Sequence, residues 1–356
     1  MEYKALKDIA TITMGQSPES SSYNSIKDGL PFFQGNADFG EKYPNEKVWC
    51  NNPKKLAEPG DILISVRAPI GAVNYAKNRC CIGRGLAAIS IEDEIERNFV
   101  FHLLKARNSE LNQQGTGSTF KAIGKSVLEN LQVPQIAPIE LKKCINMMGL
   151  LEAAIRKRKK QLELLDELVK ARFVEMFGEP IANTRSLETK ALKDVLVLKA
   201  GDFTAASDIV DEPNEVNKYP CYGGNGIRGY VAEYNQEGEY SLVGRQGALS
   251  GNVQFAKGRF KNTEHALLVT PLTEMNTIWL NQLLINLDLK RYQTGAAQPG
   301  LSVKNLQEIP IVVVPLKEQN SFASFVAQVD KSKVAVQKAL DETQLLFDSL
   351  MQDYFG

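Results

Sequence analysis

One glycine-rich stretch has the spacing of a phosphate-binding turn. Gly224-Asn-Gly226-Ile-Arg-Gly229 satisfies G-x-G-x-x-G, whose glycines let the backbone approach a pyrophosphate at the start of a helix. The residues that follow, Tyr230-Val-Ala-Glu-Tyr234, favour a strand, and the matching stretch Gly35-Asn-Ala-Asp-Phe-Gly40 keeps only two of the three glycines. We therefore expect a turn that presents its backbone and Asn225 to a partner. The hypothesis that the chain is a dinucleotide-dependent enzyme rests on this turn alone.

The two histidines are the other residues suited to acid–base or metal chemistry. His102 and His265 lie in different halves of the chain, and neither has a histidine at the matching position of the other half. A metal site or catalytic pair would need them to converge with further ligands, and no ligand spacing supports that. We expect His102 to pack on a helix beside Phe101 and Leu103. His265 belongs to a polar loop that aligns with Arg84.

Motifs for catalysis are missing from the sequence. There is no N-P-P-[YF] of a methyltransferase, no Walker A loop and no nuclease carboxylate cluster with its lysine; Asn51-Asn-Pro-Lys54 resembles the first only superficially. We therefore predict no catalytic residue, no metal ligand and no cofactor bound by this chain.

Composition indicates an ordinary globular protein with more than one core. The 356 residues fit two domains or two copies of one, and 43% of them are hydrophobic. The formal net charge is zero, so composition alone neither announces nor excludes a polyanionic ligand. The five cysteines show no C-x-x-C spacing, which suits a reducing cytoplasm. No signal peptide or membrane-spanning run is expected.

The chain contains an internal repeat. Motifs of the first half recur in order in the second: Lys4-Ala-Leu-Lys-Asp8 as Lys190-Ala-Leu-Lys-Asp194, Pro31-Phe-Phe-Gln-Gly-Asn36 as Pro220-Cys-Tyr-Gly-Gly-Asn225, Gly60-Asp-Ile-Leu-Ile-Ser-Val-Arg67 as Gly238-Glu-Tyr-Ser-Leu-Val-Gly-Arg245, and Gly117-Ser-Thr-Phe-Lys121 as Gly295-Ala-Ala-Gln-Pro299. Short runs rich in β-forming residues indicate a compact mixed sheet in each copy. Helices are expected over 99–114 and 277–292.

Each copy ends in a long amphipathic helix. Apolar residues recur at steps of three and four among Lys, Arg and Glu, which predicts a helix of about 55 Å whose apolar seam needs a second helix beside it. The seam residues are Leu151, Ile155, Leu162, Leu165 and Val169 in the first helix and Val329, Val336, Leu340, Phe347 and Leu350 in the second. Two such helices in one chain pair most simply antiparallel.

The sequence therefore predicts an α+β protein with a pseudo-twofold internal repeat. Two similar mixed α/β domains are joined by two long antiparallel helices that form a coiled coil, with the domains held at a set separation. The expected boundaries are a first domain at 1–138, a long helix at 139–178, a linker at 179–189, a second domain at 190–315 and a long helix at 316–356.

These motifs carry a resemblance that covers essentially the whole chain. The chain has two divergent domains, each followed by a charged helix. Each domain begins with a variant of Tyr3-Lys-Ala-Leu-Lys-Asp-Ile-Ala10 and contains variants of Gly60-Asp-Ile-Leu-Ile-Ser-Val-Arg67 and Gly117-Ser-Thr-Phe-Lys-Ala-Ile123. In this order the motifs resemble the specificity subunit of Type I restriction-modification enzymes. Gly295-Ala-Ala-Gln-Pro299 departs from the commoner form of the second motif.

The resemblance implies a non-catalytic, cytoplasmic DNA-recognition subunit. Each domain would be a target-recognition domain for one half of a bipartite, asymmetric site in double-stranded DNA. The helices would set the spacer and dock two methyltransferase subunits, to which ATP-dependent restriction subunits attach. S-adenosylmethionine, ATP and Mg²⁺ would then belong to these partners.

Cations and polar side chains in matching places become candidates for DNA contact. Matched cations, which can bind phosphate or form structural salt bridges, are Arg67 with Arg245, Arg79 with Arg259, and Lys77 with Lys257. Equivalent residues cannot carry the difference between two half-sites, so unmatched residues should recognise bases. These are Gln34, Asn36, Arg84 and Lys121 in the first copy and Asn225, Arg228, Lys261, His265 and Gln298 in the second.

Two alternatives stay open. Arg156-Lys-Arg-Lys-Lys160 on the first long helix is either a solvated face or a phosphate contact. The chain as a whole is either the DNA-recognition subunit or a coiled-coil adaptor that binds proteins and does not act on DNA.

Overall fold

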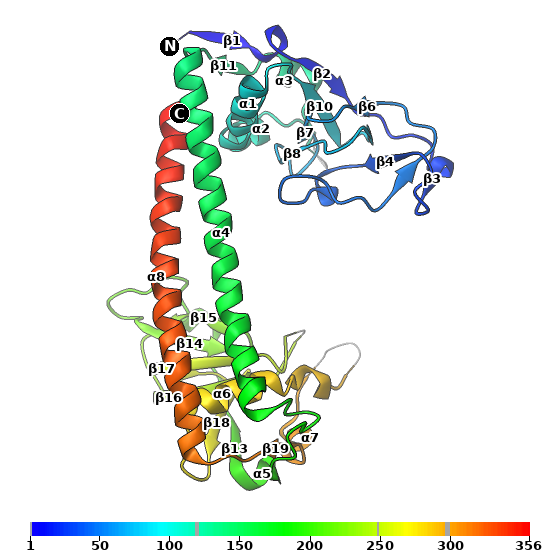
Figure 1. The fold of residues 1–356 in the computed structure, drawn as a ribbon. Helices are drawn as coiled ribbons and strands as arrows, with labels where there is room; N and C mark the ends of the chain where they lie inside the picture. Colours follow the sequence, from blue (N-terminus) through cyan, green and yellow to red (C-terminus); the bar gives the residue numbers. More distant parts are fainter. Residues whose placement is uncertain (1, 118–120, 248, 296–299) are drawn as a thin grey trace. The chain divides into compact units, whose positions relative to one another are not determined.

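The chain forms two compact units. Unit 1 comprises residues 1–157 and 339–356, and unit 2 comprises residues 158–338. Each unit contains a globular domain and part of both long helices, α4 (Pro138–Phe177) and α8 (Leu316–Phe355) (Figure 1). The computed structural model describes residues 2–117, 121–247, 249–295 and 300–356. None of the described helices is both long and apolar enough to cross a membrane.

Both long helices contain 40 residues and are delimited by the same signals. Pro138 is the first residue of α4, and Pro315 directly precedes α8, where a missing N–H and a fixed φ suit the first turn. Gly178 and Gly356 follow the last turns with φ of 76° and 86°, in the left-handed region that glycine adopts readily. Each donates its N–H to the carbonyl four residues earlier. The helix ends lie within one residue of the positions expected from the sequence.

In unit 2 the end of α4 packs against the start of α8 and against α6 (Thr277–Asn286). The ring centroids of Phe173 and Phe322 are 5.5 Å apart, and those of Phe177 and Trp279 are 6.0 Å apart. All four side chains are fully buried, each contributing on the order of 1.5–3 kcal/mol. The helix ends therefore belong to the core of the domain.

In unit 1 the pairing is reversed, because the start of α4 meets the end of α8. Phe355 of α8 lies 4.9 Å from Phe99 of α1 (Glu94–Ala106), in a core that includes Cys144 and Met148 of α4. The helices thus run antiparallel through each unit. The ten seam residues expected from the sequence are all buried or half-buried, which confirms the coiled-coil interpretation.

The described residues of unit 1 form three sheets. A four-stranded antiparallel sheet has the order β2–β10–β7–β8, formed by Thr11–Met14, Leu86–Ser90, Ile62–Ser65 and Val73–Tyr75. A five-stranded sheet has the order β3–β5–β4–β9–β6, formed by Tyr23–Asn24, Trp49–Cys50, Leu30–Phe33, Cys80–Ile82 and Leu56–Ala57. β1 (Tyr3–Ala5) pairs with β11 (Gln132–Pro134) just before α4.

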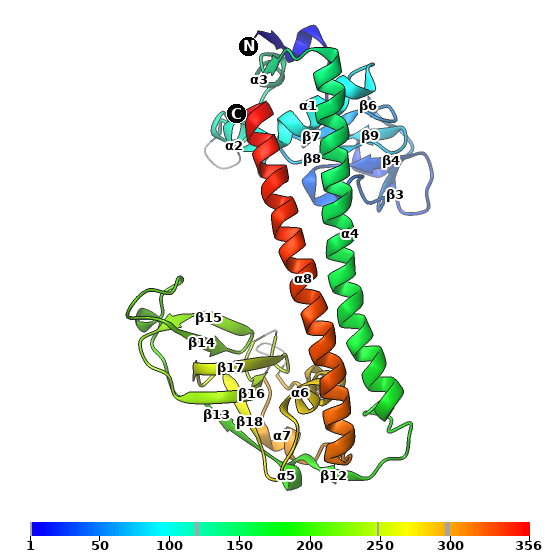
Figure 2. The same ribbon diagram turned by 60° about the vertical axis from the view of Figure 1, so that its left-hand side comes forward.

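Unit 2 has one continuous sheet of six strands (Figure 2). Its order is β13–β18–β16–β17–β14–β15, formed by Leu196–Ala200, Ala266–Pro271, Gln236–Gly244, Val253–Asn262, Tyr219–Gly223 and Gly226–Val231. β12 (Thr189–Ala191) pairs with β19 (Pro310–Val312) just before α8, as β1 pairs with β11.

Short helices complete each domain. Unit 1 has α2 (Asn108–Gln113) and α3 (Lys125–Glu129), and unit 2 has α5 (Leu192–Val195) and α7 (Val303–Gln307). The helix expected over 99–114 is wrong in detail, because α1 begins at Glu94 and ends before Arg107, whose ψ of 17° is not helical. The helix expected over 277–292 likewise ends at Asn286 and gives way to a 3₁₀ turn.

Pairing shows how the two domains correspond. β4 pairs with β9 in parallel at Phe32↔Cys81, and β14 pairs with β17 in parallel at Cys221↔Lys261. β8 pairs with β7 as the first half of β17 pairs with β16. The single strand β17 of unit 2 therefore corresponds to two strands of unit 1, β8 and β9, which are separated by a turn. The internal repeat is confirmed.

Candidate nucleic-acid interface

Four extended segments lie side by side at one end of the sheets in unit 1. Gly85 N donates to Gln34 O at 3.1 Å, Val66 N to Gly85 O at 2.9 Å, and Ile123 N to Val66 O at 3.0 Å. The segments carry the exposed side chains of Gln34, Arg84, Arg67 and Lys121. We call these four residues the first rim. The structure thus brings together four of the residues that the sequence suggested for DNA contact.

Close backbone approach holds the first rim together. A Cβ on Gly85 would lie 2.4 Å from Gln34 O, so only glycine fits there. Ser17 Oγ accepts from Gln34 Nε2 and from Arg84 N, each at 3.2 Å. Asp38 accepts from Gln34 N at 2.7 Å in the turn that contains Asn36. Sequence reasoning missed Ser17, because nothing in its neighbours marks it as the link between two distant loops.

The first rim is cationic. Arg67, Arg84 and Lys121 form no ion pair with any other residue that the structure describes, and all three are exposed. Unpaired arginines and lysines on one edge suit phosphates and guanine edges.

The equivalent segments of unit 2 form a second rim with different side chains. Arg245 N donates to His265 O at 2.9 Å, and Leu301 N donates to Arg245 O at 2.8 Å. A Cβ on Gly244 would lie 2.1 Å from Gly224 O, so these loops are also in close contact. We define the second rim by Asn225, Arg245, Gln246 and His265.

Contacts among amide side chains, a histidine and a carboxylate dominate the second rim. His265 Nδ1 lies 2.8 Å from Gln246 Oε1, and His265 Nε2 lies 3.1 Å from Glu264 Oε1. Asn252 Nδ2 donates to Asn225 Oδ1 at 2.9 Å. Glu264 Oε2 is buried without a hydrogen-bond partner in the described part of the chain. Amide and imidazole groups arranged this way suit base edges better than phosphates.

Two matches expected from the sequence are wrong by one residue. Arg67 forms a bridge with Ala122, and Gln246 forms the equivalent bridge with Gly300, so Arg67 corresponds to Gln246. Arg245, which the sequence matched with Arg67, takes the place of Val66, because each accepts the hydrogen bond of the next segment. Likewise His265 corresponds to Gly85 and not to Arg84. The two errors are separate one-residue shifts, one after β7 and β16 and the other in the loops that precede β10 and β18.

Four other candidates lie outside the rims, in and beside β8, β9 and β17. Arg79 pairs with Glu58 at 2.9 Å and Arg259 with Glu237 at 3.1 Å, an equivalent pair in each unit. Lys257 pairs with Glu239 at 2.8 Å, and the hydrogen bond from Lys257 lowers the pKa of Glu239. Lys77 lies in the turn after β8. Such exposed pairs contribute little to stability.

Two further candidates of unit 2, Arg228 and Lys261, lie on strands β15 and β17. Arg228, on β15, is exposed and packs against Gly223. Lys261, on β17, lies 3.7 Å from Asp202, whose pKa is lowered by the hydrogen bond from Asn235 and by Lys261. Gln298 lies outside the described residues. The glycine-rich turn at 224–226 joins β14 to β15 and is followed by a strand, which excludes the helix that a dinucleotide site requires.

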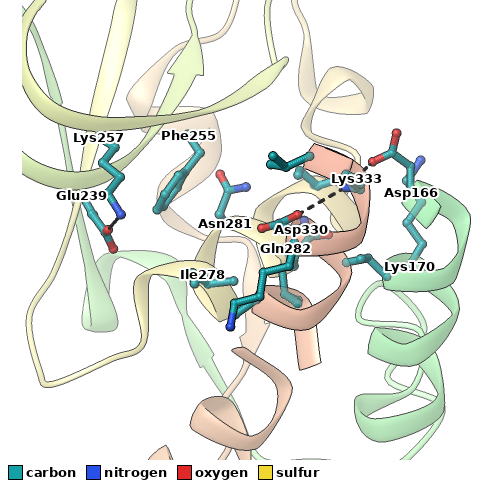
Figure 3. A pocket seen from close by; sticks show the side chains of 16 residues that line it. Asp166, Lys170, Glu239, Phe255, Lys257, Ile278, Asn281, Gln282, Asp330 and Lys333 are labelled. Atoms are coloured by element: carbon teal, nitrogen blue, oxygen red, sulfur yellow. Dashed lines mark ion pairs between the residues drawn. The ribbon is translucent and has the colours of Figure 1, made fainter. Parts of the chain in front are cut away.

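A cleft of about 870 Å³ in unit 2 has a different character (Figure 3). It lies between α6, β16, β17 and the adjoining parts of α4 and α8. Lys333 pairs with Asp166 at 2.7 Å within it, as Lys257 does with Glu239. Three acidic groups and four lysines line this cleft, and Lys257 and Lys333 are already paired with the acidic groups, so the cleft does not suit a polyanion.

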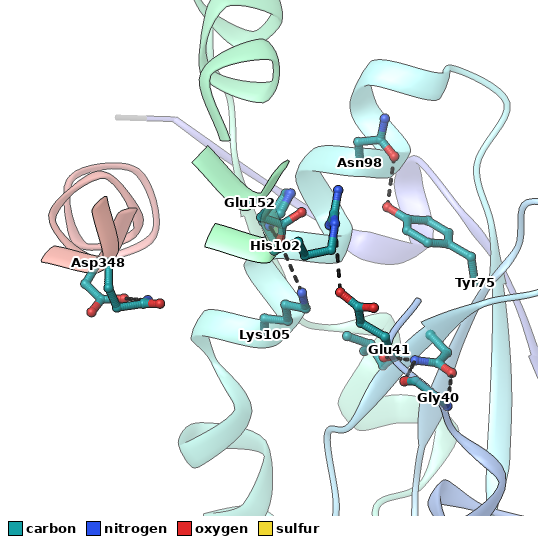
Figure 4. A network of polar contacts seen from close by, with 12 residues as sticks. Gly40, Glu41, Tyr75, Asn98, His102, Lys105, Glu152 and Asp348 are labelled. Carbon is teal, nitrogen blue, oxygen red and sulfur yellow. Dashed lines mark hydrogen bonds and ion pairs between the residues drawn. The ribbon is translucent and has the colours of Figure 1, made fainter. Parts of the chain in front are cut away.

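His102 has a structural environment, as expected. It is 5% exposed between α1 and the long helices, with Nδ1 4.0 Å from Glu152 Oε1 and without a hydrogen-bond partner among the described residues (Figure 4). Burial lowers the pKa of His102 to about 4, although Glu152 opposes this. His102 is therefore neutral near pH 7. Within the described ranges no three His, Cys, Asp or Glu side chains gather as a metal site would need.

Comparison with known proteins agrees with this arrangement. The family described as Type I restriction modification DNA specificity domain matches residues 1–145 and 185–343. The Type I restriction enzyme EcoprrI specificity subunit of Escherichia coli is 30% identical over 300 residues, 78% of this chain and 72% of that protein. A putative Type I restriction enzyme MjaX specificity subunit of Methanocaldococcus jannaschii is 43% identical over 161 residues, 45% of this chain but only 38% of the relative.

A solved structure shares the fold. The crystal structure of a Type I restriction-modification system S subunit from M. genitalium aligns with a TM-score of 0.65 and 18% identity, covering 100% of this chain and 96% of that one.

Proposed function

The chain belongs to the Type I restriction-modification DNA specificity family, and from this premise we propose that it is the non-catalytic subunit that recognises the DNA sequence of such a complex. Each domain would bind one half of a bipartite, asymmetric site. The observation that carries the proposal is the pair of rims, which share a backbone arrangement and differ in their side chains. Two equivalent scaffolds with different polar groups can recognise two different half-sites.

The rims supply the contacts that recognition requires. The cations of the first rim can neutralise phosphates, and Asn225 and Gln246 offer donors and acceptors to base edges in the major groove. The long helices would set the number of base pairs between the half-sites. Each is continuous for 40 residues, so its length does not depend on loop conformation.

Partner subunits would dock on the long helices and perform the chemistry. Apolar side chains that the seam does not use are exposed there: Ile139 is 85% exposed, Leu150 72% and Leu345 70%. Ile139 and Leu150 line one shallow depression on α4 together with Met147, and contiguous exposed apolar surface of this kind marks interaction sites. We propose that two methyltransferase subunits that use S-adenosylmethionine bind these helices, and that restriction subunits that use ATP and Mg²⁺ join them, in the cytoplasm.

Sequencing the methylated sites of cells tests the proposal. Cells that produce this chain with its methyltransferase partner should gain methylation at one bipartite motif, absent from cells that produce the partner alone. A coiled-coil adaptor gives no such motif. The purified complex should also lose duplex affinity steeply as salt rises, whereas an adaptor shows no retention on any duplex.

The spacer has its own test. Adding one heptad to both α4 and α8 lengthens them by about 10 Å, roughly three base pairs. The unmethylated gap between the half-sites should grow accordingly, while the half-sites stay the same. An unchanged gap would contradict the role of the helices.

A further inference from the structure

One position of the rims differs between the units in a way that matches the chemistry of base recognition. Arg67 and Gln246 follow the equivalent strands β7 and β16, and both side chains are exposed. Arginine makes bidentate contacts with guanine O6 and N7, and glutamine makes them with adenine N6 and N7. We propose that this position determines one base in each half-site, guanine through Arg67 and adenine through Gln246. The inference rests on the proposed function.

Neighbouring groups orient the Gln246 amide. Glu264 Oε1 lies 3.1 Å from His265 Nε2, and this contact orients the imidazole ring. The other ring nitrogen, Nδ1, contacts Gln246 Oε1 at 2.8 Å. An amide oxygen accepts two hydrogen bonds and an amide nitrogen donates two, so one contact with His265 leaves an acceptor and a donor for a base. A side chain held in place loses less conformational entropy on binding.

The backbone of Arg67 is also held. Its carbonyl accepts from Ser65 Oγ at 2.9 Å, and the next residue, Ala68, donates its N–H to Lys121 O at 3.1 Å. Its guanidinium forms no ion pair with another described residue, unlike those of Arg79 and Arg259. A fixed backbone with an unpaired fork is suited to bidentate recognition of guanine.

Arg245 is the competing candidate in unit 2, and its surroundings differ. Its side chain is half-buried, whereas that of Gln246 is exposed. Its N–H and carbonyl bond to the segments on either side, as those of Val66 do in unit 1. A valine at the equivalent place shows that this position serves the scaffold in both units.

Exchanging the two side chains tests the inference in the assembled complex. The full-length variants Q246R and R67Q are produced with the methyltransferase partner, and the methylated motif of each is sequenced. Q246R should change adenine to guanine at one position of one half-site and leave the other half-site unchanged. R67Q should change guanine to adenine in the other half-site. Preference for the original base should fall roughly 5- to 150-fold in each case.

The controls separate this inference from the proposed function. R259Q removes an exposed arginine that is already paired with Glu237 and should leave both half-sites unaltered. Absence of a bipartite motif with the unaltered chain overturns the proposed function itself. An intact motif that neither Q246R nor R67Q changes overturns only the inference. If Q246R does not assemble, Q246A replaces it, and retained preference for one base at every position of its half-site overturns the inference.

His265 acts as a positioning residue, which gives a second readout. H265F removes the contact with Gln246 Oε1 but leaves the amide itself. The preferred base should stay the same while the preference for it weakens several-fold at that one position. A changed base, or a uniform loss over the half-site, contradicts positioning by His265.

Discussion

The first and second rims occupy equivalent places in their domains but present different side chains. Three exposed cations, Arg67, Arg84 and Lys121, belong to the first rim, whereas the second has one half-buried arginine, Arg245, beside Asn225, Gln246 and a histidine oriented by a carboxylate. The same backbone bonds between segments support both. The scaffold therefore does not depend on the side chains that it displays, so that recognition can change without loss of the fold.

The largest difference between the units should appear when the core of only one is damaged. Trp279→Ala removes a fully buried ring from unit 2 and should cost about 3–5 kcal/mol of its stability. Hydrogen exchange measured separately for 158–338 and 1–157 should show loss of protection only in the former. Trp279→Phe is the matched control with a smaller loss, because Nε1 has no hydrogen-bond partner among the described residues. Equal loss of protection in both units would contradict separate cores.

The buried histidine should make the stability of unit 1 depend on pH. Its folded pKa, about 4, lies below the ordinary 6.5, so the unfolded chain binds the proton more readily. The neutral histidine contributes on the order of 3 kcal/mol to the free energy of unfolding above pH 6.5. This contribution declines as pH falls and is lost near pH 4. In denaturant titrations from pH 7 to 4, His102→Phe should show a flatter profile. If the stability of His102→Phe depends on pH as steeply as that of the unaltered protein, groups other than His102 cause the dependence.

Matched glycine substitutions should disable one rim at a time. A Cβ at Gly244 or Gly85 meets a backbone carbonyl, so Gly244→Ala and Gly85→Ala should each cost about 1–3 kcal/mol. Binding assays with half-site variants should show relaxed recognition of one half-site for each substitution. Relaxation of the same half-site by both would show that the rims are not independent.

Salt dependence should distinguish the exposed cations of the first rim from the amides of the second. Arg84→Ala and Lys121→Ala should each lower the slope of log affinity against log salt by about 0.9, the value for one phosphate contact. Asn225→Ala should weaken binding with the slope unchanged. Fluorescence anisotropy of the assembled complex at four salt concentrations measures this, and equal slopes for all three variants would remove the distinction.

The smallest effect is expected where the units agree. Arg79→Ala and Arg259→Ala remove equivalent exposed ion pairs outside the rims. Thermal midpoints and methylated motifs should both stay unaltered. A changed motif would show that the DNA interface also includes β17 and the turn between β8 and β9.

The sequence was sufficient for the long helices and the repeat, because helical periodicity is local and a motif can be matched without knowing its fold. It was not sufficient for the rims. Whether Arg67 corresponds to Arg245 or to Gln246 depends on strand register, which is set by pairing between distant segments. Ser17 escaped notice for the same reason, since it links Gln34 and Arg84, which only folding brings to it.

The core of unit 1 is completed by residues 339–356, which come about 180 positions after the rest of its domain. During translation the core of this domain therefore stays incomplete, and the apolar surface around Phe99 stays uncovered, until α8 has left the ribosome. Phe355 then closes it. At usual elongation rates the delay lasts on the order of 10–40 seconds. Within this period unit 2 gains most of its own contacts, while the N-terminal domain exposes apolar surface to which a chaperone can bind.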